Sequence, residues 1–310
     1  METVSVVIPT LNRPAALMRA IRSVIGQQHL SGIEIEVVVV DNSADGNARV
    51  GVETIAAGSP LAVRLIHEPR SGVASARNAG VAAATSRWVA FLDDDEEAAP
   101  DWIAEMVRIA RLSGASAVFG TVAAKAEGPA EIAGFGPYFS RRFSHADGAD
   151  ITALAAYLGT NNSMFDCATC LDGGAPFDVS LDATGGEDSL LLKQLVLRGR
   201  RFAWAGSAEV IEWVPPRRLS WQYVRKRKFL SGQIRVIVQH KLIPPQWPSI
   251  LFWMAVGCVQ LGIGGVVLAL SPPTRGRTYL TGSMLCAAGL GKILWMPRFR
   301  PTLYGLGLVS

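Results

Sequence analysis

The chain has 310 residues, of which 49% are hydrophobic and 18% charged, with a formal net charge of +4. This length accommodates one large α/β domain with an appendage, and the hydrophobic share is high for a purely soluble protein. The four cysteines are scattered, apart from Cys167 and Cys170 in "CATC". This spacing excludes a disulfide framework, and reduced, cytosolic thiols fit best. Because no second pair or His cluster completes a zinc site, we expect ordinary packing of the two close cysteines.

Residues 4–122 alternate strand-like and helix-like stretches. The chain starts directly with a strand-like run, so we expect no signal peptide. Short runs rich in Val and Ile predict strands, and Pro14 opens the first helix. The expected strands cover residues 4–10, 33–41, 62–68, 88–95 and 115–122, and the expected helices cover residues 14–25, 72–86 and 100–112. Buried strands separated by helices predict a parallel sheet covered on both faces. Ligands of such sheets bind at the carboxyl ends of the strands, where Pro9, Asp41 and residues 93–95 lie.

Five acidic residues in a row, residues 93–97, follow the strand-like run "WVAF". Their mutual repulsion has an electrostatic cost. Either a solvated loop or a bound divalent cation makes that cost acceptable. We expect Glu96 and Glu97 to be solvated, or to be charges at a helix N-terminus, and the three aspartates to be the ligand candidates.

The charge is unevenly distributed along the chain. Residues 1–212 contain all 26 acidic residues and 17 basic ones, a formal charge of −9, whereas the remaining 98 residues carry +13. Such a division predicts an acidic domain joined to a tail that faces a negative partner, either nucleic acid or anionic lipid.

Two apolar runs lie in the basic tail. Residues 250–270 are apolar apart from Gln260 and are long enough to span a bilayer as a helix, and a weaker run covers residues 279–296. The pair predicts a transmembrane hairpin or one span with a re-entrant segment; a buried pair of core helices is the alternative. Basic residues flank the pair on both sides, whereas the connecting loop has only Arg275 and Arg277. The positive-inside bias therefore places both ends in the cytoplasm, and membrane binding explains the basic tail better than nucleic-acid binding.

Residues 215–242 mix Trp, Tyr, Phe and Leu with basic residues. This mixture predicts an interfacial helix on anionic lipid headgroups, with a solvated helix face as the alternative.

Five segments resemble, in order, those of family 2 glycosyltransferases. They are "VSVVIPTLNRPAAL", "VVVVDNSADG", "EPRSGVASARNAG", "VAFLDDDEEAAPDW" and "FDVSLDATGGEDSLLLKQLVLRG". Each is a weak signal alone, but their order and spacing make the resemblance strong over about residues 3–230. It implies the α/β GT-A nucleotide-diphospho-sugar transferase fold, a mostly parallel sheet covered by helices. The expected divisions are a catalytic domain at 1–212 with a donor half of about 1–122 and an acceptor half of about 123–212, a basic interfacial segment at 213–245, and a transmembrane hairpin with a short tail at 246–310.

The resemblance implies a nucleotide-sugar site at the strand ends. Asp93 and Asp95 match the D-x-D motif, whose aspartates meet the metal–diphosphate of the donor in this family. We expect Asp95 to bind Mg²⁺ or Mn²⁺ directly, Asp93 to assist, and Asp94 to be the variable middle residue at the donor. Arg77 is expected near a nucleotide phosphate, with a helix-surface salt bridge as the alternative. The residues expected around the base and ribose are Pro9, Thr10, Asn12 and Asp41, for the last of which a turn or capping role is the alternative.

The segment "GGEDS", residues 185–189, resembles the acceptor-side E-D motif of the family. Its place at the start of an expected helix also suits ordinary capping. The resemblance implies that Asp188 is the base that deprotonates the acceptor hydroxyl and that Glu187 orients it or holds the acceptor. Asn162, in "GTNNSMF", resembles an acceptor-pocket residue, and residues 124–152 resemble a flexible loop near the acceptor. The candidates for contact with an acceptor diphosphate are Arg217, Arg218 and Arg225.

The resemblance implies an inverting, metal-dependent glycosyltransferase. We expect it to move one sugar from a nucleotide sugar, with a UDP-sugar as the first choice, to a polyprenyl-diphosphate-linked saccharide in bacterial surface or exopolysaccharide synthesis. Its catalytic domain would face the cytoplasm at the cytoplasmic membrane. The Q-x-x-R-W signature of processive synthases is not present, which favours a single transfer. Two alternatives stay open: a polyprenyl-phosphate glycosyltransferase, and a non-catalytic, membrane-tethered subunit that binds sugar nucleotides.

Overall fold

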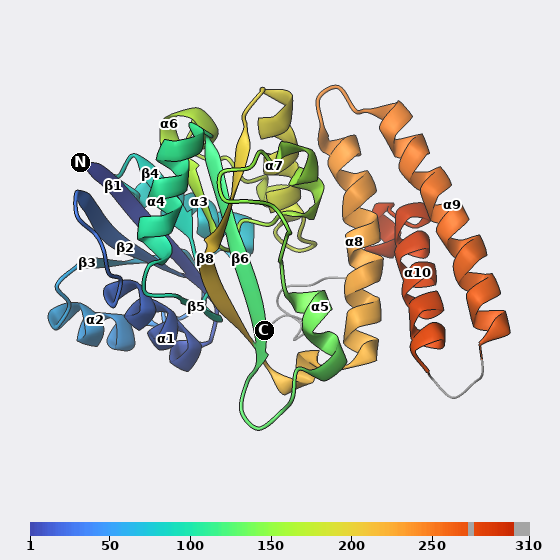
Figure 1. Cartoon of the computed structure of the whole chain (residues 1–310), viewed down its shortest axis with the longest axis horizontal. Helices are drawn as coiled ribbons and strands as arrows, with labels where there is room; N and C mark the ends of the chain where they lie inside the picture. Colours follow the sequence, from blue (N-terminus) through green and yellow to red (C-terminus); the bar gives the residue numbers. More distant parts are fainter. Residues whose placement is uncertain (272–275, 301–310) are drawn as a thin grey trace.

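An α/β domain lies beside a group of three long helices, α8, α9 and α10 (Figure 1). The computed structural model describes residues 1–271 and 276–300. Arg275, in the expected connecting loop, and residues 301–310, in the expected tail, lie outside the described residues. The sheet and its covering helices form the left side of Figure 1, and α8 lies between them and α9–α10.

The sheet has eight strands in the order β3-β2-β1-β4-β7-β6-β8-β5. The expected parallel arrangement holds for β1 to β4 and for the β6–β8 pair. The sheet as a whole is mixed, because β7 runs antiparallel between β4 and β6, and β5 pairs antiparallel with the edge of β8. The strand bounds are β1 Glu2–Thr10, β2 Ile33–Asp41, β3 Ala62–His67, β4 Trp88–Phe91, β5 Glu96–Ala98, β6 Ala117–Ala126, β7 Ser163–Asp166 and β8 Phe202–Val214.

Helices cover both faces of the sheet, as the strand pattern predicts. Alternate side chains of a strand point to opposite faces, so Val6 packs in one core cluster with α1 and α4, and Val7 packs in the other with α3 and α7. Both residues are fully buried. The helix bounds are α1 Pro14–Ile25, α2 Arg49–Ala57, α3 Val73–Ala83, α4 Trp102–Ser113, α5 Gly136–Phe139, α6 Cys167–Cys170, α7 Glu187–Leu197, α8 Trp221–Lys241, α9 Trp247–Leu270 and α10 Arg277–Ile293.

Within residues 4–122, two short elements, α2 and β5, are absent from the sequence-based prediction. In β5, Glu96 is fully buried, so the expectation that it is solvated is wrong. The long strand β8 offers a free edge, and pairing with that edge draws the acidic segment into the sheet. Glu97 is half-buried and accepts a hydrogen bond from Trp213 Nε1 at 2.9 Å. The expected loop at 124–152 contains the end of β6 and α5, and Cys170 is buried in the core as ordinary packing.

The three C-terminal helices approach one another closely at glycines. Gly257 of α9 lies against the backbone of Gly289 of α10, and Gly264 lies against that of Gly282. The two helices therefore run antiparallel. On α8, a Cβ at Gly232 would lie 2.4 Å from the Ala288 carbonyl oxygen. Helix α8, expected to be an interfacial helix, is therefore covered by α10 along part of its length.

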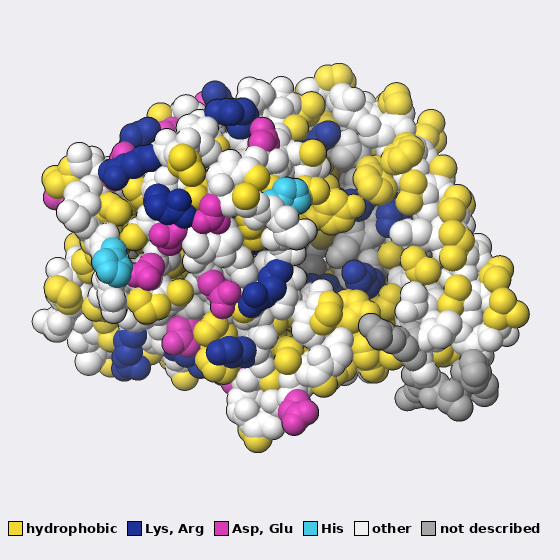
Figure 2. Space-filling view, in the orientation of Figure 1, with side chains coloured by type: hydrophobic (Ala, Val, Ile, Leu, Met, Phe, Trp, Pro, Cys, Tyr) yellow, Lys and Arg dark blue, Asp and Glu magenta, His cyan; other side chains and the backbone are white. Residues whose placement is uncertain are grey.

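Helix α9 is the one helix among the described residues that is long and apolar enough to cross a membrane. Large apolar side chains along it, such as Leu251, Val259 and Leu270, are exposed. Figure 2 shows hydrophobic side chains along the right-hand edge of the molecule, where α9 lies. Helix α10 has 17 residues, short of the roughly 20 that a bilayer core requires. The transmembrane hairpin expected from the sequence thus reduces to one candidate span with a shorter helix packed beside it.

The close α9–α10 contact makes a stability prediction. A Cβ at Gly257 would lie 2.9 Å from both the Gly289 carbonyl oxygen and Lys292 Cβ, whereas a Cβ at Gly262 meets nothing within 4 Å. We expect Gly257→Leu to lower the free energy of unfolding by about 1–3 kcal/mol through overpacking. The matched control Gly262→Leu should unfold like the wild type in thermal unfolding of the detergent-purified chain. Equal unfolding midpoints for the two variants would contradict this helix packing.

Candidate active site

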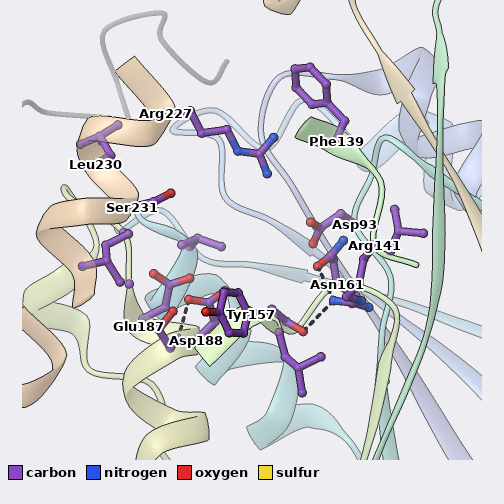
Figure 3. A pocket seen from close by; sticks show the side chains of 18 of the residues that line it. Asp93, Phe139, Arg141, Tyr157, Asn161, Glu187, Asp188, Arg227, Leu230 and Ser231 are labelled. Atoms are coloured by element: carbon purple, nitrogen blue, oxygen red, sulfur yellow. Dashed lines mark hydrogen bonds between the residues drawn. The ribbon is translucent and has the colours of Figure 1, made fainter. Parts of the chain in front are cut away.

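A cavity of about 830 Å³ lies between the carboxyl ends of the strands and α8. It is large enough for a ligand of drug size. Both acidic motifs open into it: the turn after β4 on one side and the first turn of α7 on the other. Figure 3 shows Glu187 and Asp188 on one side of this space, and Asp93, Arg141 and Asn161 on the other.

Arginines offset the repulsion in the acidic turn after β4. The turn closes with a hydrogen bond from Glu96 N to Asp93 O at 3.0 Å. Arg13 Nη1 lies 3.0 Å from Asp94 Oδ1 and 3.0 Å from Asp95 Oδ2, and Arg218 Nη1 lies 3.2 Å from the same Asp95 oxygen. These charge-assisted contacts hold the carboxylates at the cavity.

Asp94 is the most enclosed of the three aspartates, since its side chain is only 7% exposed. Thr10, at the end of β1, donates from Oγ1 to Asp94 Oδ2 at 2.8 Å. Burial raises the pKa of Asp94 to about 6, and the Arg13 charge opposes this rise. The middle residue of the motif therefore ties β1 to the acidic turn, while Asp93 is 34% exposed towards the cavity.

Arg77 bridges the two acidic motifs. Its Nη1 lies 2.5 Å from Glu187 Oε1, and its Nη2 lies 3.5 Å from Asp93 Oδ1. Helix α3 carries this guanidinium, which is buried over the ring of Phe177 at 5.8 Å. The arrangement is a buried ion-pair bridge, rather than the surface salt bridge that the sequence left as an alternative.

Two glycines place the E-D motif at the start of α7. Gly185 and Gly186 have φ of 74° and 99°, which favour glycine and turn the chain into the helix. Burial raises the pKa of Glu187 to about 7; Asp188 raises it further and Arg77 opposes the rise. Asp188 is half-buried and accepts from Ser189 N at 2.6 Å. A Cβ at Gly159 would lie 3.2 Å from Asp188 Oδ2, so a glycine there leaves this oxygen its space.

In addition to Arg13, three charged residues at the site were not assigned a role there from the sequence. They are Glu96, Glu212 and Arg141. Glu96 accepts from Asp93 N at 3.0 Å and from Asn161 Nδ2 at 2.9 Å. Glu212, opposite Glu96 in the β5–β8 pair, lines the cavity, and burial raises its pKa to about 7. Arg141 donates to four backbone carbonyls, including those of Gly120 and Gly159. The segments around Arg141 and Glu212 lack a motif, and the one available signal is that Glu212 is the last acidic residue of the chain.

Nine of the expected site residues line the cavity. They are Pro9, Thr10, Arg77, Asp93, Asp94, Asp95, Glu187, Asp188 and Arg218.

Asn12, Asp41, Asn162 and Arg217 lie outside the cavity lining. Asp41 is fully buried and accepts from Ser43 N at 2.9 Å and Ala48 N at 2.7 Å, which is the turn-capping alternative. Asn12 is exposed and pairs with the side chain of Asn47.

Asn162 and Arg217 lie outside the cavity for opposite reasons, the first because it is buried and the second because it is exposed. Asn162 is fully buried, where it accepts from Trp102 Nε1 and donates to two carbonyls, so the neighbouring Asn161 takes its expected place in the cavity. Arg217 is exposed on the outside, as is Arg225, whereas the adjacent Arg218 turns inward to Asp95.

The donor set suits a hard cation that is held jointly with a ligand. Among the described residues, no group of three or more His, Cys, Asp or Glu side chains forms a self-contained metal site. Asp93 and Asp95 nevertheless present carboxylates to the cavity. Mg²⁺ in particular is often bound through one or two carboxylates with substrate phosphates supplying further oxygens. The residues therefore fit a metal that arrives with a diphosphate.

The comparison with known families matches one model, "Glycosyl transferase family 2", over residues 5–167. Among curated proteins, the chain is 32% identical over 230 residues to the succinoglycan biosynthesis protein ExoM of Rhizobium meliloti, covering 72% of this chain and 71% of ExoM. It is 40% identical over 114 residues to the succinoglycan biosynthesis protein ExoO of the same organism, covering 36% of this chain and 31% of ExoO.

Solved structures share the fold. The mannosyltransferase PcManGT from Pyrobaculum calidifontis, in complex with GDP-Man and Mn²⁺, superposes with a TM-score of 0.60 at 21% identity, covering 94% of this chain and 87% of that one. S. aureus TarS 1-349 in complex with UDP superposes with a TM-score of 0.55 at 15% identity, covering 94% and 90%. At these identities the likeness supports the architecture alone.

The buried Glu187 makes a prediction about pH. Because its pKa of about 7 lies above the ordinary value of 4.5, the folded protein holds this proton more tightly than the unfolded chain does. The stabilisation that this proton contributes is complete at pH values below 4.5 and is lost as the pH rises to about 7. Over this range the free energy of unfolding falls by up to roughly 1.4 kcal/mol per pH unit. We expect Glu187→Gln to show a flatter loss of unfolding free energy over this range in urea titrations. Glu53→Gln, exposed on α2, should keep the wild-type slope, and an unchanged slope in Glu187→Gln would contradict the raised pKa.

Proposed function

The chain belongs to glycosyltransferase family 2, and on this basis we propose that it moves one sugar, with inversion, from a nucleotide sugar to a lipid-linked saccharide. The observation that carries the proposal is that both acidic motifs open into the same cavity and are tied together by Arg77. One motif suits the donor and the other suits the acceptor. A UDP-sugar is the expected donor, and bacterial surface or exopolysaccharide synthesis is the expected setting, which the likeness to ExoM supports.

The donor end is the turn after β4. Asp95 would hold Mg²⁺ or Mn²⁺ with help from Asp93; the ion's chemistry there is to neutralise the negative charge that develops on the leaving diphosphate. Arg13 and Arg218 contact Asp95 and line the cavity, so their guanidinium groups are also within reach of phosphate oxygens. Pro9 and Thr10 lie beside this turn and would contact the nucleoside.

The acceptor end is the first turn of α7. A sugar hydroxyl ionises far above neutral pH, so it needs a base. In the proposed step, Asp188 takes the hydroxyl proton, the acceptor oxygen bonds to the anomeric carbon, and the bond from that carbon to the diphosphate oxygen breaks. The nucleoside diphosphate leaves on the opposite face with the bonding electron pair. Glu187, fixed by Arg77, holds the turn that orients Asp188.

Helix α9 would anchor this enzyme in the cytoplasmic membrane. It is the candidate span among the described residues, and its outer apolar side chains are exposed. The basic residues between Glu212 and α9 outnumber those that follow α9, which favours a catalytic domain on the cytoplasmic side, near anionic lipid.

Loss of the base or of the metal ligand should stop transfer. We expect Asp188→Asn to lower the rate of sugar transfer by about 10²–10⁴-fold, the usual contribution of a general base. Asp95→Ala should abolish the release that depends on Mn²⁺ or Mg²⁺. The measurement is nucleoside-diphosphate release by the detergent-purified chain from UDP-, GDP- and dTDP-sugars, with and without a bacterial extract of lipid-linked saccharides.

The matched control is Asp172→Asn, an exposed carboxylate outside the cavity lining, which should retain the wild-type rate. Transfer to the saccharide at the wild-type rate by Asp188→Asn would overturn the assignment of the base. Release onto plain polyprenyl phosphate that survives Asp188→Asn would favour a polyprenyl-phosphate glycosyltransferase instead, because an anionic acceptor needs no base.

A further inference from the structure

The wall of the cavity formed by α8 is cationic. Arg227, Lys228 and Arg235, which we call the α8 cations, all line it. Within the described residues none of the three forms a salt bridge to a carboxylate, in contrast to Arg13, Arg77 and Arg218 at the acidic end. Figure 2 shows Lys and Arg side chains at the hollow between the α/β domain and the C-terminal helices.

Aromatic rings, instead of carboxylates, support the α8 cations. The guanidinium of Arg227 lies 5.2 Å from the ring centre of Phe139, and the ammonium of Lys228 lies 5.4 Å from that of Tyr138. Arg235 lies 4.6 Å from the ring centre of Tyr157. A ring face stabilises a cation without using its N–H groups, so those groups stay available to donate to an anion.

The grouping of these charges has an electrostatic cost. Lys228 and Arg235 are half-buried. Burial, together with the positive charges of Arg227 and Arg235, lowers the pKa of Lys228. Like charges held together away from water destabilise the protein unless an opposite charge joins them. An anionic ligand in the cavity supplies that charge.

Arg235 lies close to the turn that bears Asp188. Its neighbour Ile234 packs on α7, where a Cβ at Gly186 would lie 3.2 Å from the Ile234 side chain. Tyr157, under Arg235, precedes Gly159, which packs against Asp188. Figure 3 shows Tyr157 beside Asp188. An anion on Arg235 would therefore sit next to the proposed acceptor end.

An apolar surface begins on the other side of Arg235. Trp253 of α9 lines the cavity, and its ring centre lies 5.7 Å from the Arg235 guanidinium. Next to it, Leu251 and Phe252 are 64% and 60% exposed. A ligand with its anionic group on α8 can therefore continue as a hydrocarbon chain along α9, where the apolar side chains exclude water.

We propose that the α8 cations bind the phosphate or diphosphate group that joins the acceptor saccharide to its lipid. This inference rests on the proposed function and replaces Arg217 and Arg225, which lie outside the cavity lining, as the residues for that group. The saccharide then extends from Arg235 towards Asp188, and the lipid extends along α9. The acidic end, where the arginines are already paired with carboxylates, is left to the donor and its metal.

Binding of farnesyl diphosphate to the detergent-purified full chain tests the proposal without any turnover. We expect Arg235→Gln and Lys228→Gln to weaken its Kd about tenfold each, an effect of about 1.4 kcal/mol for the loss of one charge-assisted contact. The matched control is Arg225→Gln, which removes the same charge from an exposed position of the same helix and should bind as the wild type does. Arg235→Lys should recover part of the affinity, and thermal unfolding checks that each variant is folded.

Three comparison probes separate the sources of the anion. Farnesol, which lacks the diphosphate, should bind weakly and without dependence on Arg235, and inorganic diphosphate should bind more weakly than farnesyl diphosphate. Equal affinity for inorganic and farnesyl diphosphate would overturn the lipid part of the proposal. Arg225→Gln and Arg235→Gln losing phosphatidylglycerol-vesicle binding equally, with farnesyl diphosphate binding unchanged in both, would overturn the whole proposal in favour of headgroup contact.

Turnover distinguishes this proposal from the function on which it rests. With the lipid-linked extract, Arg235→Gln should raise the KM for the acceptor about tenfold and leave the KM for the nucleotide sugar unchanged. Normal turnover with an unchanged acceptor KM in Arg235→Gln would overturn the role of α8 alone. Binding of farnesyl diphosphate that depends on Arg235, without nucleotide release under any condition, would overturn the proposed function while leaving the α8 site standing.

Discussion

The site depends on the pairing of buried carboxylates with arginines. Carboxylates from the ends of β4 and β8 and from the first turn of α7 face one cavity, where low solvation makes their repulsion large. Arg77 offsets this repulsion, because its one guanidinium contacts Glu187 of one motif and Asp93 of the other. Removal of such a buried partner leaves an uncompensated charge that costs several kcal/mol. The distance between the two motifs is therefore set by an ion pair as well as by the sheet.

The pairing of β5 with β8 adds a second, less balanced set of charges. It places Glu96 opposite Glu212, although like charges facing each other across a pair of strands are destabilising. Burial raises the pKa of both groups, and the nearby Arg141 carries a compensating positive charge. A fold selected for stability alone would place apolar residues there. Charge retained at such a position is typical of a functional site, where a local rule is broken and compensated elsewhere.

The sequence predicts best what local pattern determines. The structure confirms Thr10 at the end of β1 and the start of α7 after the double glycine, whereas β4 ends at Phe91 and leaves Asp93–Asp95 in the turn that follows it. The sequence predicts poorly what depends on partners distant in the chain. The burial of Glu96 follows from pairing with a strand more than a hundred residues later, and no local signal in "DDDEE" reveals it.

The same dependence on distant partners explains why some expected residues lie outside the cavity while an adjacent residue lines it. In the pairs Asn161–Asn162 and Arg217–Arg218, one member faces the cavity and the other does not. A motif identifies the pair, but the local backbone conformation determines which of the two side chains faces the cavity. Asp41 lies at the expected strand end, yet both of its carboxylate oxygens accept from the following turn, which a strand pattern does not show.

The division of charge along the sequence has a spatial counterpart in the cavity. The acidic turn after β4 and the basic residues of α8 belong to different parts of the chain, yet they line one space. Such a gradient suits two anionic substrates that must not exchange places. The cation of a metal-bound diphosphate is attracted to the carboxylates of the acidic turn. A metal-free phosphate group is repelled by these carboxylates and attracted to the cations of α8. In the proposed function, this polarity sorts donor from acceptor before either sugar is recognised, and it leaves Asp188 between them at the place where proton transfer is required.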